Sequence, residues 1–270
     1  MEDDKAMADD KSAAHRPALE DDAFPPEKDE ELPAYSPPSK NPLSAHIPLA
    51  QQLQVAAAGP SAGVNRQFPP EFNLYSPGVL TRGFHLGVHK DAPIYVVTTH
   101  SGWSGNPDVV LHTTTDPKSP PLATADFKAF SHDTTIVLPP LGAASPAAPT
   151  MMKGTFLMRT FNFSVEVSAP GGQLRSEPFE WRHSRGDEVH TLGSVWGRGW
   201  KLVRLAGPAP GTKEVVAAFT SGPLSWTKRF CFRFVGAGET GVLGERWAVM
   251  AVISAMAIWE KERRASSNND

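Results

Sequence analysis

The chain has 270 residues, 40% of them hydrophobic, and carries 26 Lys and Arg against 29 Asp and Glu. This density of positive charge is far below that of a nucleic-acid-binding protein, so we expect neither DNA nor RNA as a partner. The single cysteine, Cys231, excludes an intramolecular disulfide and any zinc site built from cysteines.

Residues 1–78 are predicted to form a disordered acidic tail. The first forty residues hold twelve acidic and five basic side chains, and the segment is rich in Pro, Ala and Ser with too few large apolar residues for a core. No basic segment followed by an apolar run begins the chain, so we expect no signal peptide. A cytoplasmic or nuclear location follows, peripheral at a membrane if the protein binds lipid.

Two short segments of this tail, 31–40 and 72–78, each place a tyrosine before Ser-Pro. Such segments favour polyproline II and dock in aromatic grooves or accept phosphate. A WW- or SH3-type partner, or a phosphorylation-dependent one, is therefore predicted around Tyr35. The alternative is a linker without a partner.

The body of the chain, 79–264, alternates short β-branched and aromatic runs with turns rich in Gly, Pro, Asn and Asp. A low-complexity loop is expected at 139–150. Strands are predicted at 83–90, 94–100, 108–113, 122–127, 134–138, 155–167, 179–183, 200–205, 214–220 and 229–235.

One long helix is predicted, at 246–263, before a polar C-terminal tail at 265–270. Its residues 247–259 contain nothing more polar than Ser254, so the helix needs cover on every side. Thirteen residues rise about 20 Å, too short for a bilayer crossing. The predicted fold is mainly β: a closed antiparallel barrel of about ten strands around this central helix.

The glycines of 236–241, GAGETG, follow a strand and precede this helix, as in a dinucleotide-binding fold. That fold needs a second parallel strand after the helix, and only seven residues remain after Arg263. We therefore predict a tight turn rather than a phosphate site, and no cofactor.

A β-rich body that ends in an apolar helix resembles the tubby C-terminal-like superfamily, which includes LURP-one-related proteins and phospholipid scramblases, and most of all its small uncharacterised fungal members. The resemblance runs from about Arg82 to Arg264. It is carried by PIYVVTTHSGWSGNPDVVLHTTTDPKSPPLATADF, PFEWRHS, WKLVRL, EVVAAFT and RWAVMAVISAMAIWEKERR. It implies a twelve-stranded barrel around a hydrophobic helix, and a Lys/Arg surface that binds phosphoinositide head groups.

Alternation along 229–235 predicts three phenylalanines facing the helix and an outer face with Arg229, Cys231 and Arg233. Together with cations on other strands, this outer face is the predicted site for an anionic head group; an ordinary solvated barrel exterior is the alternative. The predicted site residues are Lys228, Arg229, Arg233, Arg182, Lys201 and Arg204.

The flanking arginines are also expected to acidify the Cys231 thiol. No metal is predicted, because His85 and His89 lie about 13 Å apart on a strand. No catalytic motif is present in the sequence.

The sequence therefore predicts a non-enzymatic barrel that binds anionic lipid head groups or a protein partner. One alternative is an enzyme whose site is assembled from distant strands. Another is a membrane-surface protein that releases its helix into lipid.

Overall fold

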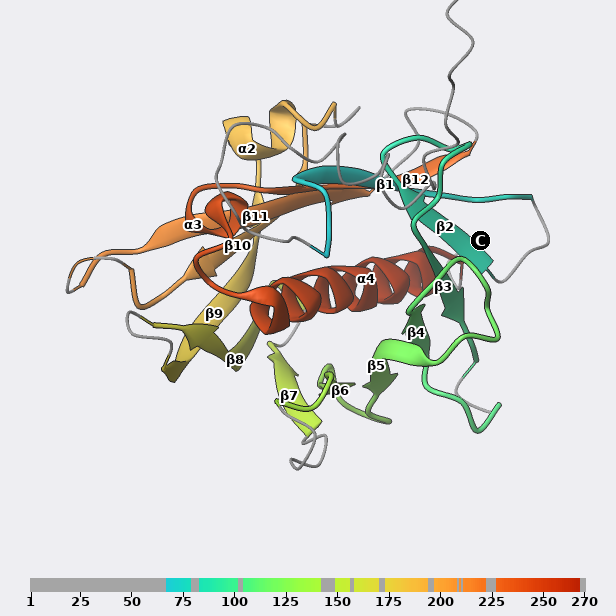
Figure 1. Cartoon of the computed structure of the whole chain (residues 1–270), viewed down its shortest axis with the longest axis horizontal. Coiled ribbons are helices and arrows are strands. Elements are labelled where there is room, and N and C mark those ends of the chain that lie inside the picture. Colours follow the sequence, from blue (N-terminus) through green and yellow to red (C-terminus); the bar gives the residue numbers. More distant parts are fainter. Residues whose placement is uncertain are drawn as a thin grey trace, which may run out of the picture. The chain divides into compact units, whose positions relative to one another are not determined.

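The computed structural model describes residues 67–267 apart from nine short gaps, and Figure 1 shows how their helices and strands are arranged. The gaps are 79–82, 102–103, 142–148, 156–157, 170–172, 194–196, 208, 210 and 222–226. The predicted disorder before residue 67 and the partner site at Tyr35 lie outside the described residues. Of the two units into which the chain divides, Met1–Pro48 and Leu49–Asp270, everything below belongs to the second.

Twelve antiparallel strands close a barrel in which each strand pairs with its neighbours in sequence and β1 pairs with β12. This confirms the predicted fold class. The strands are β1 (Glu71–Tyr75), β2 (Gly83–Gly87), β3 (Tyr95–Thr99), β4 (Val109–His112), β5 (Pro121–Phe127), β6 (Thr134–Val137), β7 (Pro149–Gly154), β8 (Thr160–Ser168), β9 (Leu174–Ser184), β10 (Gly199–Arg204), β11 (Glu214–Ser221) and β12 (Lys228–Phe234).

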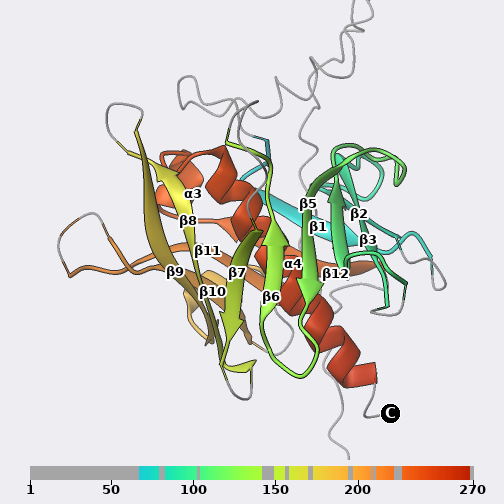
Figure 2. The same cartoon turned by 90° about the horizontal axis from the view of Figure 1, so that it is seen from below.

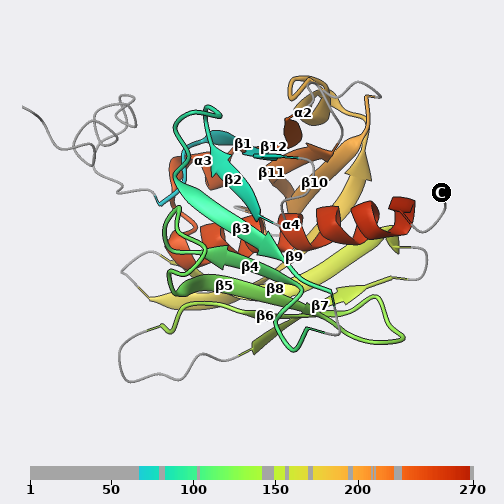
Figure 3. The same ribbon diagram turned by 90° about the vertical axis from the view of Figure 1, so that its right-hand side faces the viewer.

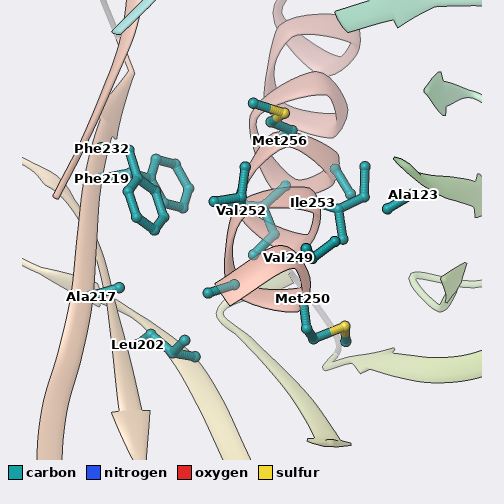
Figure 4. Close-up of a cluster of buried hydrophobic side chains, with 14 of the residues drawn as sticks. Ala123, Leu202, Ala217, Phe219, Phe232, Val249, Met250, Val252, Ile253 and Met256 are labelled. Atoms are coloured by element: carbon teal, nitrogen blue, oxygen red, sulfur yellow. The ribbon is translucent and has the colours of Figure 1, made fainter. Parts of the chain in front are cut away.

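The C-terminal helix α4 (Glu245–Ser267) runs through this barrel (Figures 1 and 3). Its residues 249–260 are all buried, as a segment apolar on every side requires. In Figure 4, Phe219 and Phe232 face the helix from one wall and Ala123 from the opposite wall. No helix in the described part of the chain has the length and apolar character that a bilayer crossing demands.

The strands follow the predicted alternation where they face α4. Phe230, Phe232 and Phe234 are buried, and Phe232 stacks on Phe72 of β1 with ring centroids 4.9 Å apart. The only polar side chain of α4 between Trp247 and Trp259 is Ser254, whose hydroxyl accepts a hydrogen bond from the Trp181 indole at 2.9 Å. The core therefore consists of the inner faces of the strands around α4.

Two strands were not predicted. β1 lies in the segment assigned to the disordered tail, so the barrel begins at Glu71 rather than at residue 79. Phe72 and Leu74 are fully buried in it, and this Tyr-Ser-Pro segment is part of the fold rather than an unfolded docking motif. β7 replaces the end of the predicted low-complexity loop, and α4 continues to Ser267, into the predicted tail.

The glycine loop is a turn, as predicted. It contains the one-turn helix α3 (Ala237–Thr240) and leads from β12 toward α4. A Cβ on Gly238 would lie 2.1 Å from the Val216 carbonyl oxygen, so only glycine allows this close approach.

The antiparallel order places the connections after β1, β3, β5, β7, β9 and β11 at one end of the barrel. Residues 260–267 of α4 lie at the same end, because Lys261 bonds to the β5–β6 loop and Arg264 to the β3–β4 loop. Figure 2 shows the β5–β6 loop beside the C-terminal part of α4. We call this end the exit rim.

Candidate functional site

The strand register brings three of the six predicted cations into one row on the barrel exterior. Arg182 pairs with Lys201, Lys201 with Ala218, and Ala218 with Arg233. Lys228 and Arg229 begin β12 at the exit rim, whereas Arg204 ends β10 near the opposite rim. The six residues therefore do not form one cluster.

Each cation of the row already faces a carboxylate. Arg182 pairs with Glu180, Lys201 with Glu188 at 3.1 Å, and Arg233 with Glu71 at 2.6 Å. These ion pairs reduce the positive potential that an anionic head group would meet on the outer face.

Arg204 is held even more tightly than the row. It contacts Glu177 at 2.6 Å and Glu214 at 3.7 Å, and the Glu177 side chain is only 1% exposed. Although burial raises the pKa of Glu177, the hydrogen bonds from Arg204 and Arg175 outweigh it and leave that pKa below its usual value. Arg204 therefore stabilises the outer wall rather than presenting a free charge.

A hollow of about 740 Å³ opens at the exit rim, beside the emerging end of α4. Its wall combines residues from β9, β10, β11 and α4 that are far apart in sequence. They are His183, Ser184, Arg185, Arg198, Gly199, Trp200, Ser221 and Glu262. A smaller cavity of about 100 Å³ shares three of these residues and adds the apolar side chains of Met158, Phe161 and Ile258.

One part of the wall of the hollow is a carboxylate held beside an aromatic pair. Glu262 accepts hydrogen bonds from the Trp200 indole at 2.9 Å and from the Ser221 hydroxyl at 3.0 Å. His183 and Trp200 are cross-strand partners with ring centroids 3.8 Å apart. These contacts orient Glu262 and place the imidazole beside it.

The wall of the hollow also carries two arginines. Arg185 and Arg198 are exposed on its wall. Burial lowers the pKa of His183, and Arg198 and Arg159 lower it further while Glu262 opposes them. The hollow thus presents two guanidinium groups, a largely neutral imidazole at pH 7 and one anchored carboxylate.

A second charged cluster fastens α4 to the other side of the exit rim. Arg264 contacts Asp108 at 2.6 Å and Glu260 at 2.8 Å, and both of these carboxylates are buried. Lys261 donates to the carbonyl of His132 at 3.0 Å and lies over the Phe127 ring. Desolvation lowers the pKa of Lys261 to about 8. These contacts hold the C-terminal end of α4 against the loops of the barrel.

The predicted acidification of Cys231 is wrong. The residue is 2% exposed and packs with Leu192 and Ala218 on the outer side of the sheet. Burial raises the pKa of the Cys231 thiol to about 11, outweighing the nearby cations Lys228 and Arg233. Sequence spacing showed the flanking arginines but not the cover provided by Leu192, which follows α2 (Asp187–His190).

Comparisons with family models, with curated proteins and with solved structures found no match. The class of protein is therefore described by its fold alone: a closed twelve-stranded barrel around a helix, with a charged hollow at one rim. The described residues contain no group of three or more His, Cys, Asp or Glu placed to hold a metal ion.

Proposed function

We propose that the protein is a non-enzymatic binding protein that holds an anionic head group in the hollow of the exit rim, and that it belongs to the tubby C-terminal-like superfamily. The observation that carries the binding proposal is the pair of exposed guanidinium groups, Arg185 and Arg198, on the wall of a 740 Å³ hollow. Guanidinium groups bind phosphate through charge-assisted, often bidentate hydrogen bonds.

The proposal moves the centre of the site away from the outer-face cations predicted from the sequence. Arg182 and Lys201 form the cross-strand pair next to the His183–Trp200 pair, so they lie beside the hollow on the outer face of the sheet. Their carboxylate partners leave them a supporting electrostatic role. Trp200 and Ser221 hold the Glu262 carboxylate in a fixed position against the wall of the hollow.

The architecture suits a binder because α4 occupies the barrel interior. Ligands are thereby restricted to the rims and the outer wall. The cytoplasmic or nuclear location, peripheral at a membrane, is part of the same proposal.

The test is calorimetric titration with two soluble head groups, myo-inositol trisphosphate and glycerophosphoserine. We expect binding that Arg185→Glu/Arg198→Glu weakens at least about tenfold, since one charge-assisted hydrogen bond contributes about 1.5–3 kcal/mol. The matched control is Lys118→Glu/Lys213→Glu, which makes the same change in net charge at exposed sites on the opposite rim. Equal loss in both variants would show a nonspecific charge effect and reject the hollow as the site.

The second candidate is an enzyme, favoured by the convergence of His183 and Glu262 from distant elements. A largely neutral imidazole close to a fixed carboxylate is suited to general acid–base catalysis. Release of phosphate from p-nitrophenyl phosphate, lost in His183→Gln while head-group affinity is kept, would support this candidate. Head-group binding without turnover supports the binding protein.

A further inference from the structure

Phe130 is the most exposed large apolar side chain in the described part of the barrel. It is fully exposed, at 108% of the reference area, and its φ angle is +61°. A bulky residue in this left-handed region is uncommon and costs conformational energy. The fold therefore holds an aromatic ring in water on a strained backbone, midway along the β5–β6 loop on the exit rim. Figure 2 shows the course of this loop.

The base of this loop is firmly held. Lys128 N–H donates to the Asp133 carbonyl at 3.1 Å, and the Asp133 carboxylate accepts from Gly154 N–H of β7 at 3.1 Å. Lys261 of α4 donates to the carbonyls of His132 and Asp133 at 3.0 and 3.4 Å. The loop is thus tied to a neighbouring strand and to the central helix, and only its apex projects.

Positive side chains lie in this loop and in the neighbouring connection from β7 to β8, on the same rim. Lys128 is exposed in the same loop, and Lys153 and Arg159 are exposed at the end of β7 and just before β8. Asp126 is also exposed, at the end of β5, so the surroundings of the loop carry one acidic side chain beside these basic ones. A projecting aromatic ring with basic neighbours matches the interface of an anionic bilayer, where rings enter the head-group region and cations meet lipid phosphates.

We propose that Phe130 is a membrane anchor that enters the head-group region of an anionic bilayer when the exit rim docks on it. The proposal rests on the proposed head-group binding and adds its geometry: Phe130 and the hollow of Arg185 and Arg198 lie on the same rim. A protein partner would need an apolar surface around the ring, whereas the exposed neighbours named above are charged.

A fluorescent label at position 130 tests the contact directly. In a Cys231→Ser background, Phe130→Cys carries an environment-sensitive fluorophore, and Val242→Cys carries the same label on an exposed apolar position of the opposite rim. With vesicles of phosphatidylcholine and phosphatidylserine, we expect a blue shift and quenching by brominated lipids at position 130 and neither effect at 242. A label at 130 that stays in water while the protein is bound overturns the proposal and leaves a protein partner as the occupant of Phe130.

Unlabelled variants measure the energetic contribution. Phe130→Ser should lower vesicle partitioning about tenfold, because burying a large apolar side chain favours association by this factor or more. Phe130→Leu should retain most of the binding, and Val242→Ser all of it. Equal partitioning of wild type and Phe130→Ser, or no partitioning of the wild type, overturns the anchor. The soluble head-group titration does not involve Phe130, so its result judges the proposed function separately.

Discussion

Replacing Ser254 with alanine tests whether α4 sits inside the barrel in the register described. Ser254 and Trp181 are both fully buried, and the hydroxyl accepts the indole N–H at 2.9 Å. The alanine variant leaves that N–H without a partner and costs about 1–3 kcal/mol. Better helix propensity returns about 0.5 kcal/mol, so we expect a net loss of about 1–2 kcal/mol.

Urea unfolding measures this loss. With an m value of about 3 kcal/mol/M, the midpoint should fall by about 0.5 M. A Trp181→Phe background removes the donor, so there Ser254→Ala should cost nothing, and the double-mutant cycle should give a coupling of about 1 kcal/mol or more. Ser266→Ala, on the exposed end of the same helix, is the control and should change stability by less than about 0.5 kcal/mol. If Ser254→Ala leaves the free energy of unfolding unchanged both in the wild-type chain and in the Trp181→Phe background, Ser254 does not contact Trp181 and the described position of α4 in the barrel is wrong.

Three further predictions concern single sites. Lys261 has a folded-state pKa of about 8 against a usual value of 10.5, so the unfolded chain binds more protons than the folded protein between these two pH values. In urea titrations, the stability of the wild type relative to Lys261→Met should therefore be constant below pH 8 and rise from pH 8 to 10.5. A stability difference that does not change with pH over the whole range would contradict the burial of the ammonium group. Cys231, with its pKa raised to about 11 by burial, should react slowly with Ellman's reagent at pH 8 in the native protein and rapidly in urea, and fast native labelling would show that the thiol is accessible. Gly238→Ala should lose roughly 1–3 kcal/mol in the same unfolding assay, because its Cβ would lie 2.1 Å from the Val216 oxygen; unchanged stability would mean that the turn is looser than described.

The barrel could be predicted because alternation and helix polarity are local signals. Ten of the twelve strands were predicted from short β-branched and aromatic runs between turn residues, many of them alternating, and the uninterrupted apolar character of 247–259 requires a helix enclosed by protein. β1 was missed because its five residues stand in a Pro-rich context, and β7 because it begins with Pro149 and follows a run of small residues and prolines. Pairing with β12 stabilises β1 through the Phe72–Phe232 stack, a contact between residues 160 positions apart.

The candidate site could be predicted only in part, because alternation gives the face of a side chain but not its cross-strand neighbour. The outward direction of Arg233 followed from the alternation of β12, but its contact with Glu71 depends on barrel closure. His183 was expected on the face of Trp181, yet its position beside Glu262 of α4 depends on where the helix leaves the barrel. Contacts between distant segments therefore decide which carboxylates lie beside the cations of the outer wall and which side chains line the hollow.

The position of α4 restricts where this barrel can bind a ligand. The helix packs against the inner faces of the strands, so an internal ligand would have to displace side chains such as Met256 and Ile253, which are completely buried. On the outer wall, the row from Arg182 to Arg233 faces carboxylates. The exit rim differs from both in its shape and lining, because the polar end of α4 emerges there and contributes Glu262 to a hollow whose wall also includes Arg185 and Arg198. The residue that holds the helix end against Trp200 and Ser221 thus also lines the proposed site, so occupancy of the hollow and anchoring of α4 are physically linked.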